Sequence, residues 1–269
     1  MDWLHVERRE TPLILAFPHG GTVLPERFAG GLRRVVATVD ADWHIRALYE
    51  GLAEATLVWT DISRTIIDCN RDPSGASLYP GQTTTGLCPT ETFDGVPLYE
   101  AGAEPEAAAI AARREAWFDP YHAALAGEIA RLRALHRHVV VYDCHSIRSR
   151  VPRLFDGALP ELNIGTDRGA TCDPALEAGV TGAAAASGRS HVLNGRFRGG
   201  WTTRHYGRPQ QGVHAIQMEI AMRAYLREPE GALDDGNWPP TYDPVHAAPL
   251  RAELTRVLAA ATDFARGRS

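Results

Sequence analysis

Residues 139–146 read Val-Val-Val-Tyr-Asp-Cys-His-Ser, in which apolar β-branched residues and a tyrosine precede polar side chains. β-Branched and aromatic residues are typical of buried strands, so we expect a strand here. Because side chains alternate between the two faces of a strand, Asp143 and His145 share one face, and Cys144 points into the packing. A carboxylate and an imidazole at the carboxyl end of a buried strand favour a metal ligand or a general base.

Other strands and helices are predicted on both sides of this strand. We expect strands at 13–17, 56–59, 163–166 and 213–220, and helices at 40–52, 104–117, 119–132, 173–186 and 245–265. Asp119 and Asp173 each precede a proline and are predicted to cap their helices. This alternation predicts an α/β fold with a mostly parallel or mixed central sheet and helices on both faces. No linker divides the chain clearly, so residues 1–269 are expected to form a single domain.

The composition argues against several classes of protein. The 28 basic and 33 acidic residues give a net charge of -5, which argues against nucleic acid or an anionic membrane as the partner. The chain shows no secretory signal and no apolar run long enough to span a membrane. Its four cysteines are widely spaced, as is typical of free thiols in a reducing compartment. We therefore expect a cytoplasmic protein that is a monomer or a small homo-oligomer.

Three further polar positions lie at the ends of predicted elements. His19 follows the strand at 13–17 in a glycine-rich turn, and Glu219 lies at the end of the strand at 213–220. One of Asp40 and Asp42 is predicted to cap the helix that follows them, which leaves the other as a candidate ligand. The carboxyl ends of parallel strands meet at one edge of a sheet. Two histidines and a carboxylate with an open position are typical of catalytic zinc, and a separate glutamate is suited to moving the proton of a bound water.

Arginine and glycine are concentrated in two other segments. Arg64 and Arg71 flank a β-like segment, and a guanidinium suits binding of a carboxylate or an oxyanion. Residues 194–207 contain four glycines and three arginines without apolar periodicity, which predicts an irregular loop suited to an anionic small molecule. A serine hydrolase that uses Ser146 is disfavoured, because Ser146 and His145 point to opposite faces of the strand. His122 has apolar neighbours at helical spacing and is predicted to be packed in the core.

Several motifs in this order resemble the N-formylglutamate amidohydrolase (N-formylglutamate deformylase) family. The resemblance runs from about residue 12 to residue 226. It is carried by Pro18-His19-Gly20-Gly21, Asp40-x-Asp42, Asp68-Cys69-Asn70-Arg71, Asp143-Cys144-His145-Ser146, residues 200–207 (Gly-Trp-Thr-Thr-Arg-His-Tyr-Gly) and residues 212–220 (Gly-Val-His-Ala-Ile-Gln-Met-Glu-Ile). It implies an α/β fold akin to the zinc carboxypeptidases and aspartoacylases, of the phosphorylase/hydrolase-like type. It also implies hydrolysis of N-formyl-L-glutamate to formate and L-glutamate, a step of histidine degradation.

The resemblance also implies roles for individual residues. A divalent metal, expected to be Zn²⁺, would be bound by His19, by Asp42 or Asp40, and by His145. Arg64 would polarise the scissile carbonyl, Asn70 and Arg71 would bind a substrate carboxylate, and Glu219 would be the general base. The acid that follows the first histidine by three residues in the carboxypeptidase pattern is replaced by Thr22, so we prefer Asp42 and keep Asp40 as the alternative.

The remaining expectations concern the support of the site and the substrate. Asp143, and Asp40 if it is not a ligand, are expected to hold the ligands by hydrogen bonds. Arg196, Thr202, Arg204 and Tyr206 are expected to join Arg71 in binding the substrate, with Arg198 as an alternative second clamp, because N-formylglutamate carries two carboxylates. The alternatives are a relative that acts on another N-acyl amino acid or a small peptide, and a non-catalytic ligand-binding homologue.

Overall fold

A seven-stranded sheet crosses the molecule in the order β1-β3-β2-β4-β7-β5-β6. The structure is a computed structural model that describes residues 2–77, 81–234 and 236–267. Pairs β2–β3, β2–β4, β4–β7 and β5–β6 are parallel, whereas β1–β3 and β5–β7 are antiparallel, so the prediction of an α/β fold with a mixed sheet is confirmed. The strands are β1 (Leu4–Glu7), β2 (Leu13–Phe17), β3 (Thr56–Thr60), β4 (Val139–Ile147), β5 (Leu162–Gly165), β6 (His191–Leu193) and β7 (Val213–Ala221).

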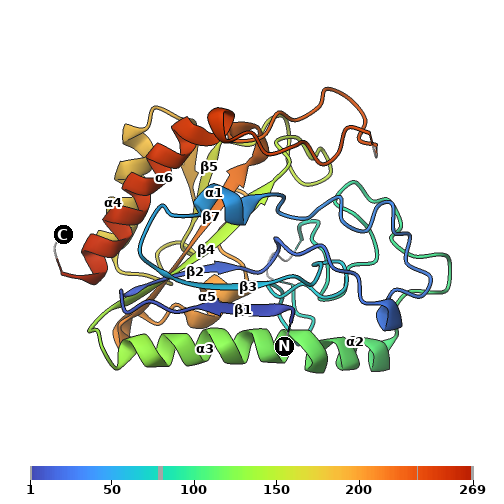
Figure 1. Ribbon diagram of the computed structural model, residues 1–269, viewed down its shortest axis with the longest axis horizontal. Coiled ribbons are helices and arrows are strands. Elements are labelled where there is room, and N and C mark those ends of the chain that lie inside the picture. Colours follow the sequence, from blue (N-terminus) through green and yellow to red (C-terminus); the bar gives the residue numbers. More distant parts are fainter. Residues whose placement is uncertain (1, 78–80, 235, 268–269) are drawn as a thin grey trace.

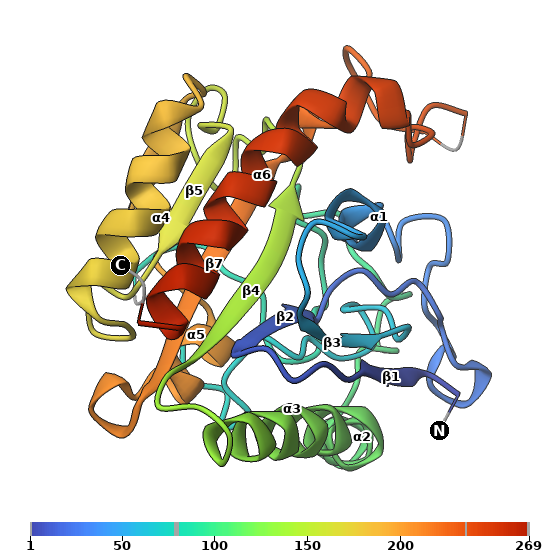
Figure 2. The same cartoon turned by 60° about the vertical axis from the view of Figure 1, so that its left-hand side comes forward.

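Helices cover both faces of this sheet (Figure 1). They are α1 (Ile45–Tyr49), α2 (Ala107–Arg113), α3 (Asp119–Arg133), α4 (Pro174–Ala186), α5 (Trp201–Tyr206) and α6 (Pro244–Ala265). Side chains from α1, α4 and α6 form one apolar core with the sheet, and side chains from α3 form the other. Figure 2 shows α4 and α6 side by side on one face, with α3 on the opposite side of the sheet. None of the described helices is both long and apolar enough to cross a membrane.

The three central strands bring polar side chains to one edge of the sheet. Every residue of β2, β4 and β7 is buried, because helices cover both faces of these strands. Strand β4 pairs with β7 along its whole length, which aligns His145 with Glu219. Strand β2 lies on the other side of β4, with Ala16 opposite Asp143. His19 comes two residues after the end of β2 and lies beside His145. The two ring centroids are 4.8 Å apart.

Two of the predicted helix caps are wrong. Helix α1 begins only at Ile45, after a left-handed residue at His44, and no side chain caps it, because both preceding aspartates have other partners. Asp119 does not cap α3 either, because α2 continues through one π-helical turn (Arg114–Phe118) into α3. The cap at Asp173 is confirmed, since its carboxylate accepts a hydrogen bond from the backbone N–H of Ala175 at the start of α4.

Other differences occur where tertiary contacts outweigh local sequence preference. Residues 64–71 form turns instead of a β-like segment, held by bonds such as that from the Asp68 N–H to the Leu87 carbonyl. Residues 201–206 form the short helix α5 within the stretch predicted to be irregular. The edge strands β1 and β6 were not predicted. His122 is packed in the core as predicted, with Nε2 2.8 Å from the Cys69 carbonyl oxygen.

Candidate active site

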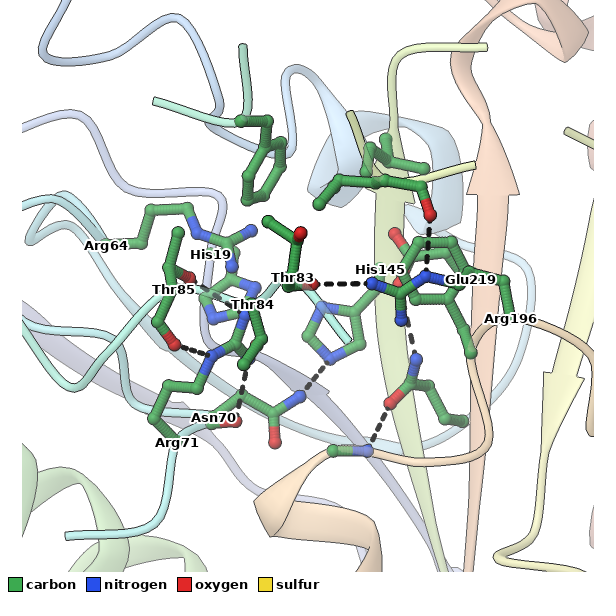
Figure 3. Close-up of a pocket in the computed structure, with 16 residues that line it drawn as sticks. His19, Arg64, Asn70, Arg71, Thr83, Thr84, Thr85, His145, Arg196 and Glu219 are labelled. Atoms are coloured by element: carbon green, nitrogen blue, oxygen red, sulfur yellow. Dashed lines mark hydrogen bonds between the residues drawn. The ribbon is translucent and has the colours of Figure 1, made fainter. Parts of the chain in front are cut away.

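A cavity opens at the carboxyl ends of the central strands (Figure 3). One side of its wall is apolar and includes Phe93, Ile147, Leu154 and Phe197. Its polar lining residues come from six separate parts of the chain and are His19, Arg64, Asn70, Arg71, Thr83, Thr84, Thr85, His145, Arg196, Gln217 and Glu219. The cavity lies where the topology of the sheet predicts a ligand site.

His19, Asp42 and His145 form a buried cluster at the back of this cavity. Their ligand atoms all lie within 4.8 Å of one another. Asp42 Oδ2 is 3.1 Å from His145 Nδ1 and 3.8 Å from His19 Nδ1. His19 Nδ1 has no hydrogen-bond partner among the described residues, although it is buried. An unpartnered imidazole nitrogen facing a second imidazole and a carboxylate is what a cation site requires, so these residues fit a divalent metal.

A further carboxylate lies next to the Nε2 atom of each histidine of this cluster. His19 Nε2 lies 2.6 Å from Asp68 Oδ1, and His145 Nε2 lies 3.0 Å from Asp143 Oδ1. The His19 Nε2–H that donates to Asp68 leaves Nδ1 to face the cluster, which is the arrangement of metal-binding histidines. The contact between His145 and Asp143 is an ion pair without hydrogen-bond geometry. Asp143 was predicted from the shared strand face to lie beside His145, whereas the contact of Asp68 with His19 was not predicted.

The two histidines of the cluster have opposite pKa shifts. Burial lowers the pKa of His19 to about 4, and the nearby Arg64 guanidinium also lowers it, so His19 is neutral at pH 7. The pKa of His145 lies well above its ordinary value, because Asp143 and Asp42 outweigh the effect of burial. His145 therefore carries a proton between two carboxylates in the metal-free protein. A metal that binds at Nδ1 releases such a proton.

Glu219 lies on β7 opposite His145 of β4, and both side chains line the cavity. It is 7% exposed, and its Oε2 accepts a hydrogen bond from Gln217 Nε2 at 3.2 Å. Burial raises the pKa of Glu219 to about 8, although the nearby His145 charge lowers it. A carboxylate with a pKa near the working pH both accepts and returns a proton efficiently. Glu219 is therefore suited to general acid–base chemistry.

The raised pKa of Glu219 predicts a pH effect on the stability of the metal-free protein. A carboxyl whose pKa rises on folding stabilises the folded state at low pH and loses this contribution as the pH rises through about 8. We expect the free energy of unfolding of Glu219→Gln, relative to the unmodified protein, to increase between pH 5 and pH 9 by roughly 2–4 kcal/mol. Urea unfolding of both proteins in EDTA measures this difference, and a difference that does not vary with pH contradicts the assignment.

Two arginines hold residues 83–85, which line the cavity. Arg71 donates to the Thr85 carbonyl from Nε at 2.9 Å and to the Thr85 hydroxyl from Nη2 at 3.0 Å, and Arg196 donates to the Thr83 carbonyl at 2.8 Å. Figure 3 shows these two guanidinium groups approaching residues 83–85 from different sides. Arg64 donates to Asp68 at 2.8 Å and lies deeper, beside His19. Three guanidinium groups give the cavity a positive charge that suits an anionic ligand.

Some residues predicted for substrate binding lie away from the cavity. Helix α5 places Thr202, Arg204 and Tyr206 outside the described lining residues. Thr202 is fully buried behind Asn70, whose Oδ1 accepts a hydrogen bond from the Thr202 N–H at 2.8 Å. Arg204 binds the Gly199 carbonyl, and Tyr206 bonds to His122. Their contacts are those of a scaffold for the cavity wall.

Asn70 lines the cavity but also holds its wall together. Its Nδ2 lies 2.9 Å from His145 Nε2 and 3.3 Å from Asp143 Oδ2. A Cβ atom at Gly200 would lie 2.3 Å from Asn70 Nδ2, so only glycine allows the approach of α5 to this side chain.

Neither Asp40 nor the Ser146 side chain belongs to the histidine cluster. Asp40 accepts hydrogen bonds from the Phe93 N–H at 2.7 Å and from Arg148 at 2.9 Å, and lies outside the histidine cluster. Ser146 accepts a hydrogen bond from the Tyr225 hydroxyl at 2.8 Å, on the face of β4 that points away from His145. Ser146 lies outside the described cavity lining.

Comparison with known proteins identifies close relatives along most of the chain. N-formylglutamate deformylase of Pseudomonas aeruginosa is 47% identical over 230 residues, which cover 84% of this chain and 86% of that protein. The enzyme of the same name from Pseudomonas putida is 41% identical over 253 residues, which cover 93% and 91%. The crystal structure of an N-formylglutamate amidohydrolase from Ralstonia eutropha superposes with a TM-score of 0.76 at 22% identity, over 100% of both chains.

A solved gene product of Agrobacterium tumefaciens has the same fold, with a TM-score of 0.70 at 20% identity over 97% of this chain and 95% of its own. The sequence profile of the N-formylglutamate amidohydrolase family matches residues 11–226. These residues include His19, Asp42, His145 and Glu219. The profile match and the identity to the two Pseudomonas enzymes show that the chain is an enzyme and belongs to the N-formylglutamate amidohydrolase family.

Proposed function

We propose that the chain is a metal-dependent amidohydrolase that hydrolyses N-formyl-L-glutamate to formate and L-glutamate. His19, Asp42 and His145 bind the divalent ion, which we expect to be Zn²⁺ because two imidazoles and one carboxylate suit this metal. The observation that carries the proposal is the unpartnered, buried Nδ1 of His19, which faces Asp42 and His145. The relatives named N-formylglutamate deformylase support the substrate.

The proposed mechanism divides the chemistry between the ion and the side chains of the cavity. The bound ion would polarise the formyl carbonyl and lower the pKa of a water molecule. Glu219 accepts a proton from the attacking water and returns it to the glutamate nitrogen as the C–N bond breaks. Arg64, which is held against Asp42 and Asp68, donates to the oxygen that gains negative charge. Its position is preorganised by these two carboxylates, so it does not reorient during the reaction.

The charges of the cavity support a substrate with two carboxylates. Arg71 and Arg196 line the cavity and both donate to residues 83–85. We propose that each guanidinium binds one carboxylate of N-formyl-L-glutamate, with Asn70 beside Arg71. Binding both ends of the substrate holds its formamide group at one place in the cavity and so lowers the entropic cost of reaction.

Metal removal provides the experimental test of this proposal. The purified protein is expected to release formate from N-formyl-L-glutamate, to lose more than about 90% of this activity after exhaustive chelation, and to regain it when one equivalent of Zn²⁺ is added. Formate release and metal content are measured on the same samples. Full activity in a protein shown to be metal-free contradicts the metal site.

The substrate is tested by comparing kcat/KM across N-formyl-L-glutamate, N-formyl-L-aspartate, N-acetyl-L-glutamate and N-formylglycine. The formyl-glutamate compound is expected to be the best of these substrates, because Arg71 and Arg196 each offer a guanidinium to one carboxylate in the proposed binding mode. Equal values for N-formylglycine would contradict the assignment of two carboxylate sites, and a better substrate among the other three would redirect the proposal to that acyl amino acid.

A further inference from the structure

Phe93 occupies a buried position between the cavity and a small apolar cluster. It is 7% exposed, and its ring centroid is 4.9 Å from Arg64 Cζ. It packs in one apolar cluster with Ile147, Val151 and Leu159. The ring therefore covers the guanidinium that faces the reacting carbonyl in the proposed mechanism, and it does so from the apolar side of the cavity.

The turn that carries Phe93 is closed by its own hydrogen bonds. The Thr92 N–H donates to the Val96 carbonyl at 2.9 Å, and the Gly95 N–H donates to the Thr92 carbonyl at 2.9 Å. The Thr92 hydroxyl accepts a further bond from the Val96 N–H at 3.1 Å, and the Leu98 N–H donates to the Thr90 carbonyl at 2.9 Å. Bonds on both sides of Phe93 restrict the backbone motion that would move its ring.

The turn is also fastened to the body of the protein at Phe93 itself. Asp40 accepts a hydrogen bond from the Phe93 N–H at 2.7 Å, and Arg148 binds Asp40 at 2.9 Å and Asp94 at 2.7 Å. Asp40 and Arg148 are largely buried, with 10% and 9% of their side-chain surface exposed. Buried ion pairs with several hydrogen bonds hold a fixed geometry. These contacts hold the Phe93 ring as a rigid wall of the cavity. Asp40 therefore has a structural role, which is to anchor this turn.

In the proposed binding mode, the Phe93 ring lies next to the acyl group of the substrate. The carbonyl carbon of an N-acyl amino acid carries an oxygen, the amide nitrogen and one acyl substituent. In the proposed binding mode the oxygen faces Arg64, and the nitrogen leads to the carboxylates that Arg71 and Arg196 bind. The acyl substituent is left to face the apolar side of the cavity, where Phe93 covers Arg64.

We propose that Phe93 sets the size of the acyl group that the enzyme accepts and restricts it to formyl. This inference rests on the proposed function, because it uses the substrate orientation given there. A formyl group presents a hydrogen to the ring, whereas an acetyl group presents a methyl group that a rigid wall cannot accommodate without a clash. One methyl group in an apolar pocket changes kcat/KM by about 10- to 200-fold.

The test measures kcat/KM for N-formyl-L-glutamate and N-acetyl-L-glutamate in matched variants. Phe93→Ala is expected to raise the acetyl-to-formyl ratio at least about 10-fold, mainly by a gain on the acetyl substrate, and Phe93→Leu is expected to raise it less. Phe28→Ala is the control, because Phe28 packs against Trp117 and Arg113 outside the described cavity lining, and its ratio is expected to stay unchanged. Arg148→Met, which loosens the anchor of the turn, is expected to shift the ratio in the same direction as Phe93→Ala.

The outcomes separate this inference from the function on which it rests. If Phe93→Ala and Phe93→Leu lower both activities equally, Phe93 only supports Arg64, and the inference is overturned. If the unmodified protein hydrolyses neither compound, the proposed function fails instead. Thermal denaturation of each variant identifies misfolding, and Phe93→Leu preserves an apolar side chain in the cluster, so the ratio can be measured even if Phe93→Ala does not fold.

Discussion

Replacement of Glu219 by glutamine is expected to lower kcat for N-formyl-L-glutamate by about 10²- to 10⁴-fold, the range typical of a lost general base. Glutamine has nearly the same shape as glutamate, and the neighbouring Gln217 amide can still donate to its carbonyl oxygen. The substituted amide cannot accept the proton of the attacking water. Since Glu219 is not a member of the His19–Asp42–His145 cluster, the metal content is expected to remain that of the unmodified enzyme.

A second buried glutamate provides a matched control for this substitution. Glu128 lies on α3, is 3% exposed and is paired with Arg8 and Arg131. It lies outside the described cavity lining. Glu128→Gln is expected to lower stability without changing kcat, because the loss of charge occurs far from the reacting atoms. The assignment of Glu219 as the base is wrong if Glu219→Gln retains full turnover with its metal bound. Metal analysis and steady-state kinetics on the same preparations distinguish these outcomes.

The central strands could be predicted from the sequence, because each contains many apolar residues that are buried by helices on both faces. Strand β2 and the first half of β4 are continuous apolar runs, and polar side chains follow these runs at His19, Asp143 and His145. Strand β7 carries Gln217 and Glu219 among its apolar residues. The edge strand β6 has only three residues, none of them buried, and therefore lacks such a signal. Strand β1 is also partly exposed, and it is defined mainly by its pairing with β3.

The geometry of the site depended on contacts that no local pattern contains. Asp68 belongs to a motif that the sequence singled out, but its hydrogen bond to His19 joins residues 49 positions apart. Phe93 and residues 83–85 lie in a long loop region, where side-chain direction is set by distant partners such as Asp40 and Arg196. Gly200 lets helix α5 approach Asn70 closely. The polar residues of α5 therefore contact neighbouring parts of the protein, as Thr202 contacts Asn70.

The two aspartates before α1 show how neighbouring residues of one type can acquire different roles. Asp42 Oδ2 is 3.1 Å from His145 Nδ1, and Asp42 Oδ1 is 3.4 Å from Arg64. Asp40 instead anchors the turn of Phe93 through its hydrogen bond with the backbone. Neither residue caps the helix, although capping is the common role of aspartate before a helix. The backbone between them turns one carboxylate towards the histidines and the other towards the loop.

Substitution of each aspartate by asparagine is expected to separate these roles. We expect Asp42→Asn to weaken Zn²⁺ binding by more than the 10- to 100-fold that loss of a supporting hydrogen bond typically costs, and turnover to fall in proportion to the metal lost. Asp68→Asn should weaken binding within that range, because Asp68 holds His19 without belonging to the cluster.

Asp40→Asn should retain the metal and instead raise the acetyl-to-formyl ratio of kcat/KM, because Asp40 anchors the turn of Phe93. Metal affinity measured by competition with a chromophoric chelator ranks the three variants. An Asp42→Asn protein that binds Zn²⁺ as tightly as Asp40→Asn contradicts the ligand assignment, since the two carboxylates would then contribute equally to a site that only one of them faces.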